Sequence, residues 1–98
     1  MFEGKKVLVC GLARSGIAAA MLLKKQSAVI TGTDTRENID FHGDIDLYLG
    51  QQPDEFVHEF ELLIISPGIS VYAPFVQKAI NLGIPVWGEA ELAYNLCP

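Results

Sequence analysis

The fold is decided by the stretch Gly11-Leu12-Ala13-Arg14-Ser15-Gly16, which lies between a hydrophobic run and a helix-forming run. Residues 5–10 before it have the apolar character of a buried strand. Residues 17–25 after it are rich in Ala, Leu and Met and predict a helix. A strand, a glycine turn and a helix form a cradle for an anion. We expect unpaired amides in the turn, and the N-terminus of a helix carries partial positive charge.

The glycine pattern is G-x-A-x-x-G, one residue away from the dinucleotide-binding pattern G-x-G-x-x-G/A. We expect Gly11 to make the tight turn and Gly16 to let the helix approach the strand closely. Ala13 replaces the middle glycine, at the point where the backbone comes nearest to a pyrophosphate. Such turns also occur without a ligand, so the motif alone predicts the fold and leaves the function open.

Strand and helix patterns alternate along the rest of the chain. Further strands are expected at residues 27–33, 47–50, 62–65 and 84–87. Helices are expected after Pro53 within 51–59, over 73–82 with Gly83 at its end, and over 88–94. Pro85 cannot donate to a strand ladder and belongs at the start of its strand or on an edge. The alternation predicts an α/β fold with a Rossmann-like, doubly wound, mainly parallel five-stranded sheet and flanking helices.

Composition limits the class of protein. The chain has 98 residues, 50% of them hydrophobic, which suffices for one domain with a buried core. The net charge of −5 disfavours nucleic acid or an anionic membrane as a partner. No apolar run reaches the roughly 20 residues that span a bilayer, and the N-terminus lacks a signal-peptide layout. Cys10 and Cys97 are expected to be free thiols, so we expect a cytoplasmic protein.

Three segments with ligand-binding character directly follow predicted strands. They are the glycine turn at 11–16, the cluster Asp34-Thr35-Arg36 and a second glycine turn at 66–69 (SPGI). In an open parallel sheet, ligands bind beyond the carboxyl ends of the strands. We therefore expect the three segments to meet at one edge and to bind a nucleotide or a nucleotide-like ligand.

Each candidate side chain also has a purely structural interpretation. Asp34 follows the glycine turn at about the spacing of the acid that binds a ribose hydroxyl, but Asp is also a common turn residue or helix cap. Arg36 can pair with Asp34 or Glu37 at the surface. Arg14 can contact a phosphate or remain a solvated loop cation. Ser15 can donate to a phosphate oxygen or cap the helix.

No residue pattern indicates catalysis or metal binding. His42 and His58 are isolated, and we expect neither to act as a ligand or a base. The sequence has no Walker lysine, no nucleophile–base pair and no carboxylate pair at useful spacing. Trp87 is expected in the core or in a domain contact. The residues alone therefore predict a binding domain.

Three segments of the sequence resemble the bacterial Mur ligases. They are residues 6–20 (KVLVCGLARSGIAAA), 63–69 (LIISPGI) and 83–92 (GIPVWGEAEL). The pairing of S-P-G-I with G-E-x-E-L is more specific than the glycine turn, and the resemblance covers essentially the whole chain. Among these ligases, the resemblance is strongest to the branch that adds D-glutamate to UDP-N-acetylmuramoyl-L-alanine.

The resemblance implies a three-domain ligase of peptidoglycan precursor synthesis. In that family the first domain holds the UDP end of the substrate, the second binds ATP and Mg²⁺ through a P-loop, and the third brings the amino acid. The substrate carboxylate is phosphorylated, and the amine of D-glutamate attacks the acyl phosphate. Residues 1–98 would then be the single UDP-binding N-terminal domain of a longer chain, inactive alone because the P-loop and metal ligands lie elsewhere.

The resemblance also implies which residues bind the substrate. Pyrophosphate contacts fall on Arg14, Ser15 and Gly68. Uracil contacts fall on Asp34 and Thr35, with Arg36 close by. The phosphate turn itself consists of Gly11, Ala13 and Gly16. Ala13 departs from the commonest glycine of the motif, which weakens the case for a dinucleotide.

Other functions remain open on the sequence alone. One is a nicotinamide- or flavin-binding domain of an oxidoreductase, and another is a ligand-sensing module that regulates a partner. A sister Mur ligase that adds a different amino acid is also open, because the residues that select the amino acid lie elsewhere. A Gly-Lys-Thr or Gly-Lys-Ser loop beyond Pro98 would favour the ligase.

Overall fold

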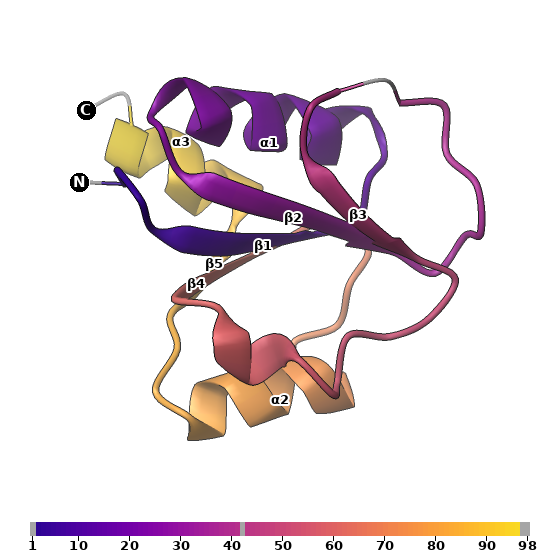
Figure 1. Ribbon diagram of the computed structural model, residues 1–98. Coiled ribbons are helices and arrows are strands. Elements are labelled where there is room, and N and C mark those ends of the chain that lie inside the picture. The colour runs from indigo at the N-terminus through magenta and orange to yellow at the C-terminus, as the bar shows by residue number, and fades with distance from the viewer. Residues whose placement is uncertain (1, 42, 97–98) are drawn as a thin grey trace.

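A parallel sheet lies between two layers of helices in the computed structural model, which describes residues 2–41 and 43–96 (Figure 1). Its strands are β1 (Lys6–Cys10), β2 (Val29–Asp34), β3 (Asp46–Leu49), β4 (Leu62–Ile65) and β5 (Val86–Gly88). The helices are α1 (Arg14–Lys25), α2 (Pro74–Asn81) and α3 (Glu89–Leu96), with a short 3₁₀ helix η1 (Val57–Glu59).

The strand order is β3-β2-β1-β4-β5, and every neighbouring pair is parallel. The chain runs outward from β1 through β2 to β3, and then crosses to β4 and β5 on the other side of β1. Helices α1 and α3 cover one face of the sheet, and η1 and α2 cover the other (Figure 1). This is the doubly wound, Rossmann-like arrangement, so the predicted fold class is confirmed.

Two central strands carry the core. Residues 7–10 of β1 are at most 1% exposed, and residues 62–65 of β4 are at most 7% exposed. Val7 and Val9 belong to the hydrophobic cluster under α1 and α3, whereas Leu8 and Cys10 belong to the cluster over η1 and α2. Both strands are buried on both faces, which explains why their sequences are continuous apolar runs without alternation.

Most element boundaries lie one or two residues from the predictions, and three differences stand out. Helix α1 begins at Arg14 and not at residue 17, because Ala13 is its extended N-cap residue. Strand β5 begins at Val86, after Pro85, whose carbonyl accepts the Leu63 N–H at 3.0 Å. Proline has no N–H for the ladder, which explains the later start. The helix predicted after Pro53 is only the 3₁₀ turn η1.

The cysteine and tryptophan predictions concern the core. Cys10 is a buried free thiol, as predicted, and burial raises the pKa of that thiol, so it is protonated at neutral pH. Trp87 packs edge-to-face on Phe2 with ring centroids 6.0 Å apart and joins the cluster under α1. Cys97 and His42 lie outside the described residues. No helix among the described residues has the length and apolar character that crossing a membrane requires.

Candidate functional site

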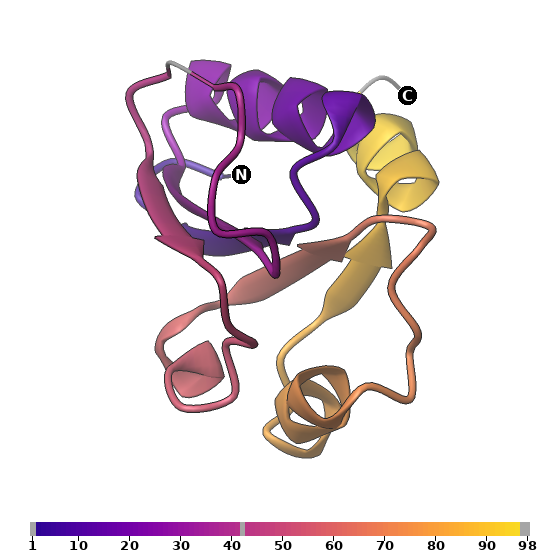
Figure 2. The ribbon, with the colours of Figure 1, turned by 90° about the vertical axis from the view of Figure 1, so that its right-hand side faces the viewer.

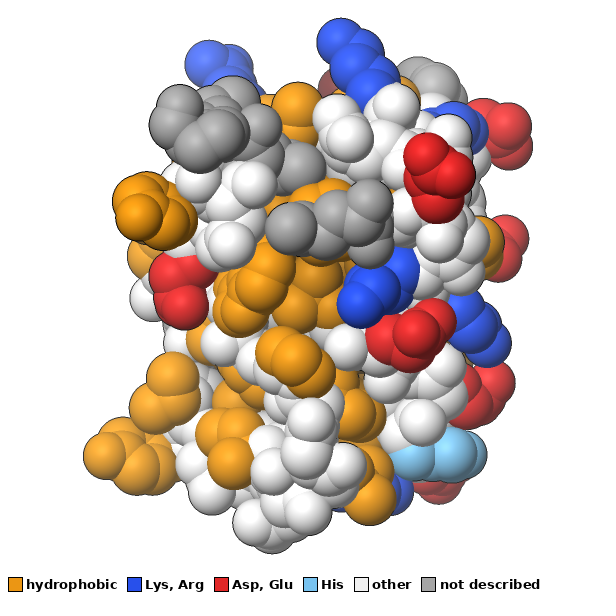
Figure 3. All heavy atoms as spheres, turned by 90° about the vertical axis from the view of Figure 1, so that its left-hand side faces the viewer, with side chains coloured by type: hydrophobic (Ala, Val, Ile, Leu, Met, Phe, Trp, Pro, Cys, Tyr) orange, Lys and Arg blue, Asp and Glu red, His pale blue; other side chains and the backbone are white. Residues whose placement is uncertain are grey.

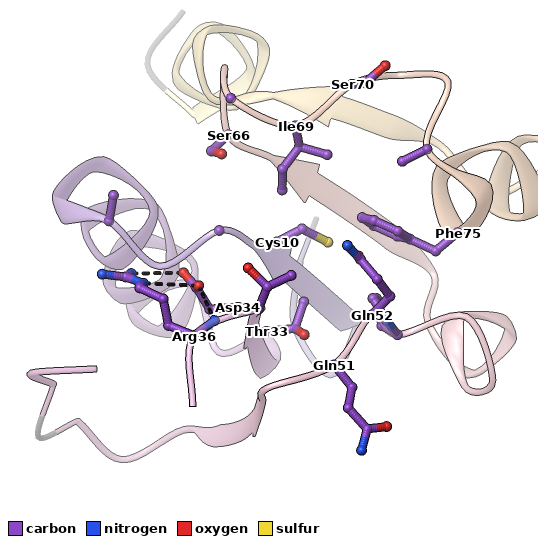
Figure 4. A pocket seen from close by; sticks show the side chains of 16 residues that line it. Cys10, Thr33, Asp34, Arg36, Gln51, Gln52, Ser66, Ile69, Ser70 and Phe75 are labelled. Atoms are coloured by element: carbon purple, nitrogen blue, oxygen red, sulfur yellow. Dashed lines mark hydrogen bonds and ion pairs between the residues drawn. The ribbon is translucent and has the colours of Figure 1, made fainter. Parts of the chain in front are cut away.

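A cavity of about 480 Å³ opens at the carboxyl ends of β1, β2 and β4 (Figure 4). Figure 2 looks onto this edge of the sheet, where the strand order reverses. The three segments singled out in the sequence all contribute to its lining, which includes Gly11, Ala13, Asp34, Thr35, Arg36, Ser66, Gly68 and Ile69. The expected meeting of the three segments at one edge is therefore observed. Arg14, Ser15 and Gly16 directly follow the lining residue Ala13 in the sequence, but they do not line the cavity.

The opposite edge of the sheet has a different character. Figure 3 shows this side, with hydrophobic side chains running down its middle and charged side chains of both signs gathered along one flank. The carboxyl edge instead brings together a helix N-terminus, two glycine turns and the Asp34–Arg36 cluster. An open parallel sheet places its ligand at this edge.

The N-terminus of α1 has no side-chain cap. Its N-cap residue is Ala13, whose carbonyl accepts the Ile17 N–H at 3.0 Å, and no side chain of the part of the chain that the structure describes bonds to the first turn. The first amides of an α-helix have no intrahelical partner, so they remain available to an anion. Ser15 is the second residue of the helix, so its alternative interpretation as the cap is wrong. Arg14 is an exposed helical residue and not a loop cation.

Two amides of the glycine turn are already engaged inside the protein. The Gly11 N–H donates to the Thr33 carbonyl at 2.8 Å, and the Leu12 N–H donates to Asp34 Oδ2 at 2.8 Å. The expectation that the turn amides are unpaired is therefore wrong for these two. The first turn of α1, just after them, keeps amides without an intrahelical partner.

The two turn glycines are required by close contacts. Gly11 has a φ of +92°, and a Cβ there would lie 2.6 Å from Ser66 Oγ. A Cβ at Gly16 would lie 1.9 Å from the carbonyl oxygen of Gly11. Helix α1 thus packs directly on the backbone of the turn, as expected for Gly16. The left-handed φ of Gly11 agrees with the tight turn expected there. Gly68 differs, because a Cβ there would meet nothing within 4 Å.

Asp34 ties the end of β2 to the glycine turn. Its Oδ2 accepts the Leu12 N–H and Arg36 Nη2, each at 2.8 Å, and its Oδ1 accepts Arg36 N and Nε, each at 3.0 Å (Figure 4). The side-chain hydrogen bonds of Arg36, with the backbone bonds of Arg36 and Leu12, hold the pKa of Asp34 well below its usual range. Asp34 is therefore ionised and paired with Arg36, as the structural interpretation of Arg36 expected, but it is the last residue of β2 and not a turn residue or a helix cap.

The sequence analysis did not predict one part of the cavity. This part, here called the neutral lobe, is lined by Cys10, Thr33, Gln51, Gln52, Pro53 and Phe75. Gln51 and Gln52 follow the carboxyl end of β3, so the rule that selected the other segments also applies to them. Phe75 comes from α2, and the sequence gives no signal that it reaches the cavity.

The sequence matches the family described as "Mur ligase MurD-like, N-terminal domain" over residues 5–88. The relatives include proteins named UDP-N-acetylmuramoylalanine–D-glutamate ligase. That of Exiguobacterium sibiricum is 43% identical over 99 residues, covering 95% of this chain and 22% of the relative. That of Listeria monocytogenes is 43% identical over 104 residues, covering 98% and 23%. That of Streptococcus suis is 45% identical over 101 residues, covering 94% and 22%.

The chain therefore spans less than a quarter of the length of these relatives, and the matched region runs through every strand of the sheet. Its five parallel strands, its glycine turn before α1 and its S-P-G-I turn after β4 all lie inside residues 5–88. On this match, the chain belongs to the MurD-like N-terminal domain family of the Mur ligases.

Proposed function

We propose that this chain binds the UDP end of UDP-N-acetylmuramoyl-L-alanine as the first domain of a longer D-glutamate-adding ligase. The observation that carries the proposal is the cavity, which joins the uncapped N-terminus of α1 to Asp34–Arg36 and to the turn at Gly68. A nucleoside diphosphate needs an anion site beside a recess for a neutral ring, and this cavity offers both. The names of these relatives support the choice of substrate.

The pyrophosphate is proposed to lie between α1 and the second glycine turn. The amides of the first helical turn, with the hydroxyl of Ser15 and the guanidinium of Arg14, supply donors and positive charge. On the other side, a phosphate can approach the backbone of Gly68 closely, because this residue has no side chain and no neighbour at its Cβ position. These residues bind and orient the substrate and take no part in bond making.

Uracil is proposed to contact Asp34 and Thr35. A carboxylate offers about four lone-pair sites, and Leu12 and Arg36 already occupy that number on Asp34. A uracil N–H must therefore replace one donor. The Arg36 side chain is 55% exposed whereas that of Asp34 is 11% exposed, so Arg36 is the partner free to move away.

This contact predicts a preference for uracil over cytosine. Cytosine has no proton at the matching ring nitrogen, so CDP would leave the carboxylate facing a lone pair. We expect the chain to bind UDP about tenfold more tightly than CDP, and Asp34→Ala to remove most of that ratio. Calorimetric titration of both proteins with both nucleotides measures it.

Glu37→Ala is the matched control, because it removes an exposed carboxylate three residues away and should keep the parent ratio. If Asp34→Ala also keeps the parent ratio of UDP to CDP affinity, Asp34 only closes the turn and does not recognise the base.

The remaining functions of the ligase are assigned to the rest of the longer protein. The described residues contain no group of three His, Cys, Asp or Glu side chains that could hold a metal ion, and the sequence contains no P-loop. We propose that ATP, Mg²⁺ and D-glutamate bind other domains of the same chain, in the cytoplasm and without nucleic acid or membrane as a partner. ATP there would activate the substrate carboxylate for attack by the amine in peptidoglycan precursor synthesis.

A nicotinamide or flavin domain is the second candidate, and one observation counts against it. Ala13 occupies the position of the middle glycine and places a methyl group where a dinucleotide pyrophosphate approaches most closely. This observation favours UDP over NAD as the ligand.

A further inference from the structure

One buried hydroxyl in the cavity lacks a partner. Thr33 is only 3% exposed, and its Oγ1 has no hydrogen-bond partner among residues 2–41 and 43–96. The same residue lines the cavity. A buried hydroxyl without a hydrogen bond costs free energy, and nearly all such groups in proteins are paired. The Thr33 hydroxyl is therefore a group that a ligand atom in the cavity can pair.

The position of Thr33 separates it from the charged part of the site. Thr33 and Asp34 are successive residues of β2, so their side chains point to opposite faces of the sheet. Asp34 bonds to Leu12 of the glycine turn, whereas Thr33 lies near Cys10 and Gln52 in the neutral lobe (Figure 4). The two side chains thus serve two different parts of the cavity.

The neutral lobe has the chemistry of a recess for an uncharged ring. Phe75 and Pro53 supply apolar surface, Gln52 supplies an amide donor and acceptor, and Cys10 remains a protonated thiol. No side chain of this lobe carries a charge at neutral pH. Small-molecule sites combine such apolar walls with a few placed polar groups.

We infer that the Thr33 hydroxyl hydrogen-bonds a ribose hydroxyl of the nucleoside, so that the uncharged ribose enters the neutral lobe while the uracil stays at Asp34 and Thr35. This inference rests on the proposed function for the class of ligand. The diphosphate stays at the N-terminus of α1, across Gly11 from the lobe, since charge is better placed at the helix end than among neutral groups. Thr33 then acts as a specificity-determining residue for the nucleoside and not for the phosphates.

Thr33→Val tests the inference, because valine keeps the β-branched shape and removes the hydroxyl. The variant should be at least as thermally stable as the parent, since an unpaired buried hydroxyl is replaced by a methyl group. Its affinity for UDP and for UMP should fall about tenfold, and its affinity for inorganic pyrophosphate should not change. Thr33→Ser should restore most of the UDP affinity.

Thr31→Val is the matched control, since Thr31 lies on the same face of β2 but outside this cavity. It should bind UDP like the parent. Parent-like UDP affinity in folded Thr33→Val, or an equal loss for pyrophosphate, would overturn the inference and leave the proposed function standing. A folded parent that binds neither UDP nor UMP would instead overturn the proposed function itself.

Discussion

Gly16→Val is expected to destabilise the domain and to remove nucleotide binding together. A Cβ at this position would lie 1.9 Å from the Gly11 carbonyl oxygen, and backbone cannot yield as a flexible side chain can. Gly11 is itself held by its N–H bond to Thr33 and by its left-handed φ. Overpacking typically costs 1–3 kcal/mol, about a fifth of the stability of a small domain, and we expect the upper end of that range.

Urea unfolding and UDP titration of the same protein measure both effects. Gly68→Ala is the control at the other glycine turn, where an added Cβ meets nothing, so its unfolding midpoint should equal the parent's. Gly16→Ala should already lower the midpoint, because the clash involves Cβ itself. A parent-like midpoint for Gly16→Val would contradict the close packing of α1 on the turn.

Ala13→Asp is expected to change stability and binding in opposite directions. Ala13 is the N-cap of α1 without a side-chain cap, and aspartate is among the best N-cap residues, so the free energy of unfolding should rise by about 1 kcal/mol. The same carboxylate would occupy the first-turn amides and repel a phosphate. Like charges placed together cost several kcal/mol, so UDP affinity should fall by about a hundredfold or more.

Ala18→Asp provides the charge-matched control for this variant. It adds the same charge on an exposed position of α1, one turn away from the cap, and should leave UDP affinity near the parent value. Thermal unfolding and calorimetry are the measurements. If Ala13→Asp is more stable and still binds UDP like the parent, the N-terminus of α1 is not where the diphosphate binds.

The sequence predicts the fold well because its strongest signals are local. The continuous apolar runs of β1 and β4 and the glycines at 11 and 16 each have one physical interpretation, and the structure agrees with it. The sequence predicts the boundary of a helix or strand less well where the conformation of a single residue decides it. Helix α1 begins at Arg14 because Ala13 adopts an extended conformation, which the sequence around Ala13 does not reveal.

The candidate site was predictable only in outline. The rule that ligands bind at the carboxyl ends of parallel strands places the Asp34–Arg36 cluster and Gly68 at one edge. That rule gives no side-chain partners, so the four bonds to Asp34 could not be read from the sequence. The unpaired hydroxyl of Thr33 could not be predicted either, since it depends on which polar groups the folded chain brings near it.

The most direct test of the account is a backbone-amide NMR titration of the 98-residue chain with UDP and, separately, with NAD. We expect UDP to shift the amide signals of residues 13–16, 33–36, 66, 68 and 69 and to leave those near Gly4 and Leu82 unchanged. We also expect UDP to bind more tightly than NAD. Tighter binding of NAD, or UDP shifts confined to residues away from the carboxyl edge, would contradict the account.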